Sequence, residues 1–291
     1  LSDTNSSVRL QSVQALLPLY EAPENKDKLE LFTVKFKTRM LSLILDQDIE
    51  VAAEAVRLLV LLARLGEMED EECEQVYLLV YSRHRKLGQA AGVFLQERLQ
   101  ARGGGGTEVT RSRRGKLRRP ASSLLRDIVT FSVEVELEGV EPFLVDSLQD
   151  CAAMRDWEAL ADLLLEEVGL GEEAFVLEDV EAAVLVALLV AGVKQGVTGQ
   201  PPEGRGGQKK VLTAREQAAG QAVREEASLV LLPCLPRILN MFLETPDTAA
   251  QVMELLQWLD PEVYTVGRQE AALDWLLVHC KEAVMQQNHP S

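Results

Sequence analysis

The chain has 291 residues, of which 47% are hydrophobic, 26% charged and 5% aromatic. This composition excludes an intrinsically disordered chain and is typical of a helical protein built from Leu, Ala, Val and Glu. The formal net charge of −16 excludes a nucleic-acid-binding surface over the whole chain, so any contact with DNA must be local.

The cysteines and the longest apolar run narrow the class of protein further. The four cysteines lie far apart and include no C-x-x-C pair, which favours buried reduced thiols in an intracellular protein over a disulfide framework or a zinc site. The longest apolar run, Ala182–Val193, is too short to span a bilayer and predicts a buried helix. No cleavable signal sequence is visible, and because the chain begins at Leu1 rather than methionine, we expect the native N-terminus to be missing.

The first three predicted helices lie within residues 8–62. An opening helix starts at about Val8 and ends near Pro18–Pro23, where proline and a polar run break it. The stretch Lys28–Leu62 then holds two segments with apolar residues at spacings of three and four, separated by the polar break Asp46-Gln47-Asp48. Their apolar rows are Phe32, Phe36, Met40 and Leu43, and then Ile49, Ala52, Ala53, Val56, Leu59 and Val60. We predict a helical hairpin that needs a second helix pair to cover its apolar face.

The rest of the chain repeats this pattern. The acidic run Gly66–Glu72 lacks the alternating ligands of a calcium loop and predicts a helix start, because carboxylates favour the positive end of a helix. The next core stripe is Cys73, Val76, Tyr77, Val80 and Tyr81, and Arg83–Arg85 are expected at the C-terminal end of that helix. Further helices are expected at about 87–101, 121–138, 142–154, 156–168, 177–195, 224–242, 247–259 and 267–287.

Thr213 and Glu216 form a capping box, and Pro233 and Pro236 must kink or divide the helix that contains them. Phe143 and Trp157 are interpreted as core anchors rather than ligand platforms.

Two loops interrupt the helices and divide them into repeats at 1–101, 121–195 and 213–291. The first loop, 102–120, has four consecutive glycines and one acid, Glu108, and predicts a flexible segment. Its candidate DNA-binding residues are Arg111, Arg113, Arg114, Lys116, Arg118 and Arg119. Such a loop suits DNA phosphates, an RNA or the protein's own acidic flanks, and it lacks the aromatics needed for base stacking. The second loop, 196–212, lacks the spacing of a phosphate-binding P-loop.

The sequence carries no recognisable catalytic chemistry. It has no nucleophile elbow, no H-E-x-x-H and no dinucleotide-binding fingerprint, and its three histidines are scattered. We therefore predict a protein that is not an enzyme and uses no cofactor. The fold class predicted is all-α, a HEAT-type solenoid of stacked antiparallel helix pairs, which presents long surfaces to extended partner segments.

Several sequence strings resemble the stromalin (stromal antigen) subunits of cohesin. LELFTVKFKTRM at Leu29–Met40 is similar to the LELFT-x-RFK-x-R segment of that family, and Val51–Leu59 is similar to its VAVEAVRLL. Further matches in the same order are VRL at Val8–Leu10, CExVYxxVYSxHR at Cys73–Arg85, AAGxFL at Ala90–Leu95, LVDSL at Leu144–Leu148, DWE at Asp156–Glu158, LLLEE at Leu163–Glu167, PPxGRG at Pro201–Gly206, VLTAxE at Val211–Glu216 and YTxGR at Tyr264–Arg268. The chain departs from the family at Lys35, Gln149 and Gln208.

The resemblance implies a fragment that begins inside the stromalin conserved domain of a longer, nuclear and chromosomal subunit. Such a subunit would bind the kleisin of cohesin and, on a composite pocket, short aromatic motifs of regulators such as shugoshin and the CCCTC-binding factor, with no membrane partner. The matched partner-binding residues are Leu31, Phe32, Lys35, Phe36 and Arg39. From the residues alone, Lys35 also fits a lysine that covers apolar neighbours. Helical periodicity supports equally well a generic HEAT-repeat adaptor unrelated to cohesin.

Overall fold

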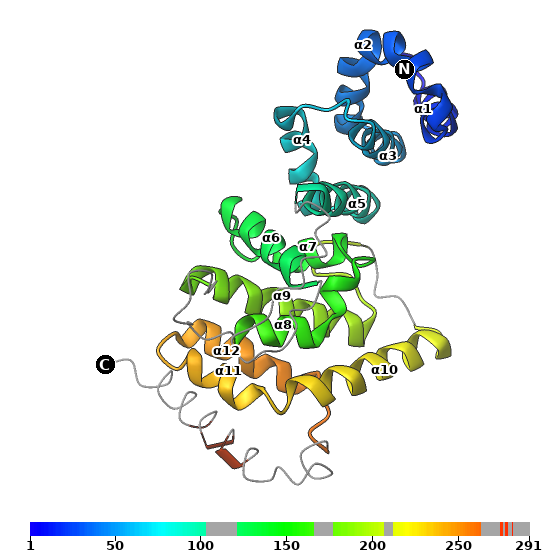
Figure 1. Cartoon of the computed structure of the whole chain (residues 1–291). Coiled ribbons are helices and arrows are strands. Elements are labelled where there is room, and N and C mark those ends of the chain that lie inside the picture. Colours follow the sequence, from blue (N-terminus) through cyan, green and yellow to red (C-terminus); the bar gives the residue numbers. More distant parts are fainter. Residues whose placement is uncertain are drawn as a thin grey trace. The chain divides into compact units, whose positions relative to one another are not determined.

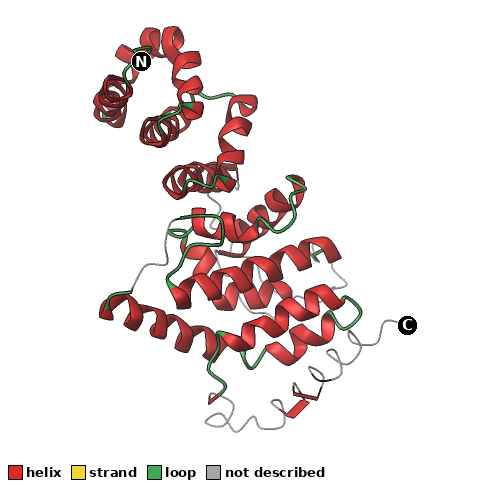
Figure 2. Ribbon diagram, turned by 180° about the vertical axis from the view of Figure 1, so that it is seen from behind, coloured by secondary structure: helices red, strands yellow, loops and turns green. Residues whose placement is uncertain are grey.

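The computed structural model describes residues 1–102, 121–165, 177–206 and 212–262, together with 274, 275, 277, 278 and 281. Every regular element in these residues is helical, which confirms the all-α prediction (Figure 1 and Figure 2). The chain divides into two compact units. Unit 1 comprises Leu1–Gly105, Asp146–Asp150 and Pro202–Gly206, and unit 2 comprises Gly106–Val145, Cys151–Pro201 and Gly207–Ser291.

Unit 1 is built around α3 (Ile49–Arg64), which packs against α1, α2 and α5 (Figure 1). Its other helices are α1 (Ser6–Glu21), η1 (Pro23–Asn25), α2 (Lys26–Ser42), η2 (Leu43–Leu45), α4 (Asp70–Tyr77), η3 (Leu78–Tyr81) and α5 (Arg85–Arg102). Every residue of α3 from Val51 to Leu62 except Arg57 is buried. A helix that is apolar on all sides is stable where neighbours cover each face, so α3 forms the core of this unit.

Unit 2 is built around α9 (Asp179–Thr198), which packs against α6, α8, α10 and α12. Its other elements are α6 (Ala121–Glu134), α7 (Glu141–Ser147), η4 (Ala152–Arg155), α8 (Trp157–Leu164), α10 (Ala214–Leu231), α11 (Leu235–Met241), α12 (Pro246–Glu254) and η5 (Leu255–Gln257). The last two residues of α7 belong to unit 1. By length and composition α9 would suit a membrane span, but nine of its residues are buried, as in the core helix of a folded domain.

Most predicted helix starts are confirmed. The polar break precedes α3, where the Asp48 side chain accepts a hydrogen bond of 3.0 Å from the second N–H of the helix. Capping boxes formed by Glu69 with Glu72 and by Thr213 with Glu216 open α4 and α10. The expected division near the two prolines lies between α10 and α11, although α10 begins at its capping box rather than at 224. The loop at 103–120 and most of the helix expected at 267–287 lie outside the described residues.

One local prediction for the first helices is wrong. Phe32 and Phe36 are only half-buried, whereas Thr33 and Met40 are the buried residues of α2. The opening helix ends at Glu21, within the predicted stretch Pro18–Pro23, and includes Pro18. Because Pro18 is exposed, the carbonyl that loses its helical partner there can turn toward water, which lessens the cost of proline inside a helix.

The helix expected at 142–154 is broken after Ser147, where α7 ends. The Asp146 and Ser147 side chains instead bind the buried guanidinium of Arg205, at 3.0 Å from each acceptor. Arg205 also lies at the C-terminal end of η3, where its Nε donates to the carbonyl of Ser82 at 2.9 Å. The cations Arg83–Arg85, expected to end that helix, lead instead into α5.

Two glycines on α5 let these segments approach its backbone. A Cβ atom added to Gly92 would lie 2.0 Å from the carbonyl oxygen of Ser147, and one added to Gly88 would lie 2.2 Å from Nη2 of Arg205. Real Cβ contacts are never this short, so a larger residue at either position must displace its neighbour. By contrast, a Cβ on the α9 glycine Gly192 would have no neighbour closer than 3.6 Å.

We predict that Gly92→Ala destabilises the chain by about 2 kcal/mol or more, because the new methyl group displaces the backbone at Ser147. The matched control, Gly192→Ala, should be neutral or stabilise by up to about 1 kcal/mol, since alanine favours a helix and has room there. Thermal unfolding of both variants by circular dichroism measures the effect. Equal melting temperatures for the two variants would contradict the close approach.

A pH-dependent contribution comes from the contact between α1 and the polar break. The Arg9 guanidinium binds Asp46 through Nε and Nη2, both at 2.7 Å. This bond holds the pKa of Asp46 below its usual value, against the opposing effect of burial. A lowered carboxyl pKa contributes stability above its unfolded-state value of about 4, and this is lost as the pH falls through the folded value.

We therefore expect Arg9→Gln to lower the melting temperature by a few degrees at neutral pH, and the difference from the parent chain to shrink below about pH 4. Melting curves recorded across this pH range test the expectation. A difference that persists unchanged at acid pH would show that the loss is not electrostatic.

Candidate partner-binding site on α2

Polar contacts fix α2 within unit 1. The hydroxyl oxygens of Thr33 and buried Tyr20 lie 2.7 Å apart, and burial raises the pKa of Tyr20, which keeps its hydroxyl protonated. One turn further along the same side of α2, Lys37 forms an ion pair of 2.6 Å with Glu72 of α4. These contacts hold α2 in place, although Thr33 and Met40 are its buried residues. Its exposed apolar side chains are therefore available to a partner.

Arg39, the last residue of the predicted partner-binding set, takes part in this internal anchoring. Its Nε and Nη2 donate to the carbonyl oxygen of Leu1 at 3.0 and 2.9 Å, and its Nη1 donates to Ser42 Oγ at 3.1 Å. The guanidinium therefore ties the beginning of the chain to α2.

One face of α2 exposes apolar side chains to solvent. Leu31 and Val34 are 84% and 72% exposed. The half-buried rings of Phe32 and Phe36 pack against each other with centroids 4.6 Å apart at 42°. The Nζ atom of Lys35 lies 5.5 Å from the Phe36 centroid. We call these five residues the α2 patch.

The chemistry of the α2 patch suits a short protein segment. Leu31 and Val34 form one exposed aliphatic row, and the Phe32 and Phe36 ring pair lies further around the helix; each can bury an aromatic or aliphatic side chain of a partner. A lysine over a ring is positioned to pair with a carboxylate at the edge of that contact.

The structure places the rings of Phe32 and Phe36 together with Lys35 beside them, and the guanidinium of Arg39 is engaged by Leu1 and Ser42. The position of Lys35 over the half-buried Phe36 ring also agrees with a lysine that covers apolar neighbours. Sequence reasoning missed Val34. The spacing of three residues between Leu31 and Val34, which places both on the same face of the helix, would have predicted it.

The predicted DNA-binding residues, Arg111, Arg113, Arg114, Lys116, Arg118 and Arg119, lie outside the described residues. In the part of the chain that the structure describes, no group of three His, Cys, Asp or Glu side chains is arranged to hold a metal ion.

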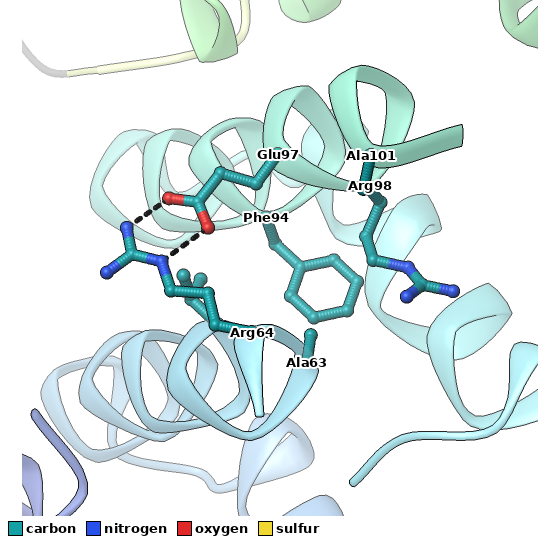
Figure 3. A pocket seen from close by; sticks show the side chains of 7 residues that line it. Ala63, Arg64, Phe94, Glu97, Arg98 and Ala101 are labelled. Carbon is teal, nitrogen blue, oxygen red and sulfur yellow. Dashed lines mark hydrogen bonds and ion pairs between the residues drawn. The ribbon is translucent and has the colours of Figure 1, made fainter. Parts of the chain in front are cut away.

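A small hollow lies between α3 and α5 of unit 1 (Figure 3). Its lining residues are Val60, Ala63, Arg64, Phe94, Glu97, Arg98 and Ala101. Figure 3 shows the Phe94 ring between the Arg64–Glu97 ion pair on one side and Arg98 on the other. Its volume of about 70 Å³ compares with a minimum of about 300 Å³ for pockets that hold cofactors or drug-sized ligands. The hollow is therefore no candidate cofactor site.

Comparison with known protein families supports a single assignment. The family described as "Cohesin subunit SCC3/SA, HEAT-repeats domain" matches residues 143–291, and the "Stromalin conservative domain" matches residues 1–37. The second match ends at Lys37 and therefore includes the whole α2 patch.

Curated relatives extend the similarity over nearly the whole chain. The cohesin subunit SA-1 of Xenopus laevis is 37% identical over 95% of this chain and 22% of its own length. The human cohesin subunit SA-3 is 37% identical over 100% of this chain and 24% of its own length. The chain thus spans about a quarter of the length of these relatives.

A solved structure shares the fold. The cohesin subunit Scc3 from Z. rouxii, residues 88–1035, superposes with a TM-score of 0.66, with 18% identity, over 98% of this chain and 33% of that one. With the family match to HEAT repeats, this supports the prediction of a helical-repeat solenoid. The chain belongs to the SCC3/SA family of cohesin subunits, the stromalins.

Proposed function

We propose that this chain is part of a non-catalytic cohesin subunit that binds the kleisin and chromatin regulators, and so supports sister-chromatid cohesion on chromosomes in the nucleus. The observation that carries the proposal is the α2 patch. It exposes apolar side chains on a helix that polar contacts already hold in place. It also coincides with the stromalin string at Leu29–Met40.

The proposed ligands of the α2 patch are short aromatic-containing motifs of regulators, such as those of shugoshin or the CCCTC-binding factor, presented together with a kleisin segment. An aromatic side chain of the motif would lie against Phe32, Phe36 and the exposed aliphatic residues, and an acidic group near Lys35. Lys35 stands where the family has arginine and cannot bind a carboxylate in bidentate fashion, so we propose weaker regulator binding than in relatives that carry arginine.

We predict that Lys35→Glu/Phe36→Ala weakens binding of a labelled peptide from the middle of cohesin's kleisin, mixed with an aromatic regulator peptide, by about tenfold or more. The change removes a ring of the α2 patch and reverses its charge. Fluorescence anisotropy with the purified chain measures the affinity. Lys35→Arg should strengthen binding of the regulator peptide if carboxylate pairing occurs there.

The matched control is Lys26→Glu, the same charge change on the same helix. Lys26 precedes Lys35 by nine residues and therefore lies about 180° around α2 from the patch. The control should bind like the parent chain. If the double variant also bound like the parent chain, while circular dichroism showed both to be helical, the proposed use of the α2 patch would be rejected.

A second proposed contact is between the basic loop and DNA phosphates, motivated by the seven arginine and lysine residues of 102–120 on an acidic chain. We predict that replacing Arg111, Arg113, Arg114, Lys116, Arg118 and Arg119 by glutamine weakens DNA binding. It should also reduce the magnitude of the slope of log affinity against log salt concentration by up to about 5. Each phosphate contact that is lost lowers the number of counterions released on binding. A matched chain with Glu108→Gln should retain the parent slope, and an unaltered affinity and slope in the six-residue variant would contradict the proposal.

A further inference from the structure

The most deeply buried charge described in unit 1 is the guanidinium of Arg205, whose side chain has 0% exposure. Its Nη2 donates to the carbonyl of Val80 at 2.6 Å and its Nε to the carbonyl of Ser82 at 2.9 Å. Its Nη1 donates to Asp146 Oδ2 and to Ser147 Oγ, both at 3.0 Å. All of these residues belong to unit 1.

The acceptors match a guanidinium ion in charge as well as in shape. Burial lowers the pKa of Arg205, and the hydrogen bond and charge of Asp146 oppose this effect, so the group stays a cation at neutral pH. Asp146 also accepts from Arg85, at 3.0 Å from Nε. The carbonyls of Val80 and Ser82 supply the further negative potential, since they end the α4–η3 helix, where the helix dipole is negative.

The site has a tight fit on its remaining side. Gly88 of α5 lies against the guanidinium, and a single Cβ atom there would come within 2.2 Å of Nη2. Ser147, which accepts from Arg205, itself donates to the carbonyl of Val80 at 2.6 Å. The pocket is thus closed around a planar cation by a backbone carbonyl pair, a carboxylate, a hydroxyl and a glycine.

Among the described residues of the segment that carries Arg205, Arg205 itself is the buried one. We call Pro202–Gly206 the strap. Within it, Glu203, Gly204 and Gly206 are exposed and Pro202 is half-buried. Gly204 and Gly206 have φ angles of +83° and +103°, values open to glycine but disfavoured for other residues. Two flexible glycines around one buried arginine leave that side chain as the principal anchor of the strap.

We propose that unit 1 contains a guanidinium-binding site, formed by Val80, Ser82, Asp146 and Ser147, which the strap occupies in cis as a releasable clip. The ligand class is an arginine side chain flanked by glycines. Release would leave Asp146 paired with Arg85 alone and free the strap without unfolding the α3 core. This device is independent of the α2 patch and of the proposed function.

Chemical rescue tests the site in the full chain. Arg205→Ala should lower the melting temperature of unit 1 by about 10 °C, because it leaves Asp146 and two carbonyls without their main donor. Guanidinium chloride at about 10 mM, far below denaturing concentrations, should restore about half of the loss and do so saturably. Urea at the same concentration, which has a similar planar shape without charge, should restore nothing.

The matched control is the double variant Arg205→Ala/Asp146→Asn, which has lost the carboxylate and should show no rescue. An unchanged melting temperature in Arg205→Ala, or equal responses to guanidinium and urea, would overturn the proposal. Sodium chloride at equal ionic strength excludes a general salt effect.

Hydrogen exchange on the unaltered chain supplies a second test that does not depend on how the variants fold. The Arg205 amide donates to the Pro202 carbonyl at 3.1 Å. If the strap is a releasable clip, this amide should exchange about tenfold or more faster than the amides of buried α3, through local opening. Exchange at the same rate as α3 would mean that the strap opens only with global unfolding, and the clip would be rejected. Adding Gly88→Ala should speed strap exchange further, whereas the control Gly192→Ala should not.

Discussion

The ion pair between Arg205 and Asp146 is the constraint on which unit 1 depends. A charge removed from water is stable only when its partners satisfy it fully, and here the partners come from two distant places in the chain, with Arg205 lying 125 residues from Val80 and 59 from Asp146. Several local features follow from this requirement. The two α5 glycines make room for the incoming segments, and α7 ends at Ser147 because the side chains there serve the cation rather than a longer helix.

The same constraint explains why the strings that resemble stromalins are spread along the chain. Val80, Ser82 and Arg85 lie in the string at 73–85, Gly92 in that at 90–95, Asp146 and Ser147 in that at 144–148, and Arg205 in that at 201–206. These segments meet at one buried cluster. The family resemblance in this part of the chain therefore coincides with the residues of this buried cluster. The string on α2 coincides instead with an exposed surface.

Sequence reasoning succeeded where structure is local and failed where it is not. Helix starts at Asp48, Glu69 and Thr213 were predictable because capping depends on residues within one turn. The half-burial of Phe32 and Phe36 was not, because periodicity defines an apolar face but not which neighbour covers it. The burial of Arg205 was not predictable, because its acceptors lie 58 to 125 residues away in the sequence. The candidate site was predicted from the family string, and periodicity alone had assigned its two rings to the core.

The late position of Arg205 also affects how the protein is made. Val80 leaves the ribosome 125 residues before Arg205 does, an interval of about 6–25 s at ordinary rates of translation. Throughout that time the carbonyls of Val80 and Ser82 lack the guanidinium of Arg205, and Asp146, once made, has Arg85 as its partner. The first helices can assemble on the nascent chain, but these buried polar groups must remain hydrated or be shielded by a chaperone until the strap emerges. Unit 1, although mostly N-terminal, therefore cannot reach its final packing until residue 205 has been made.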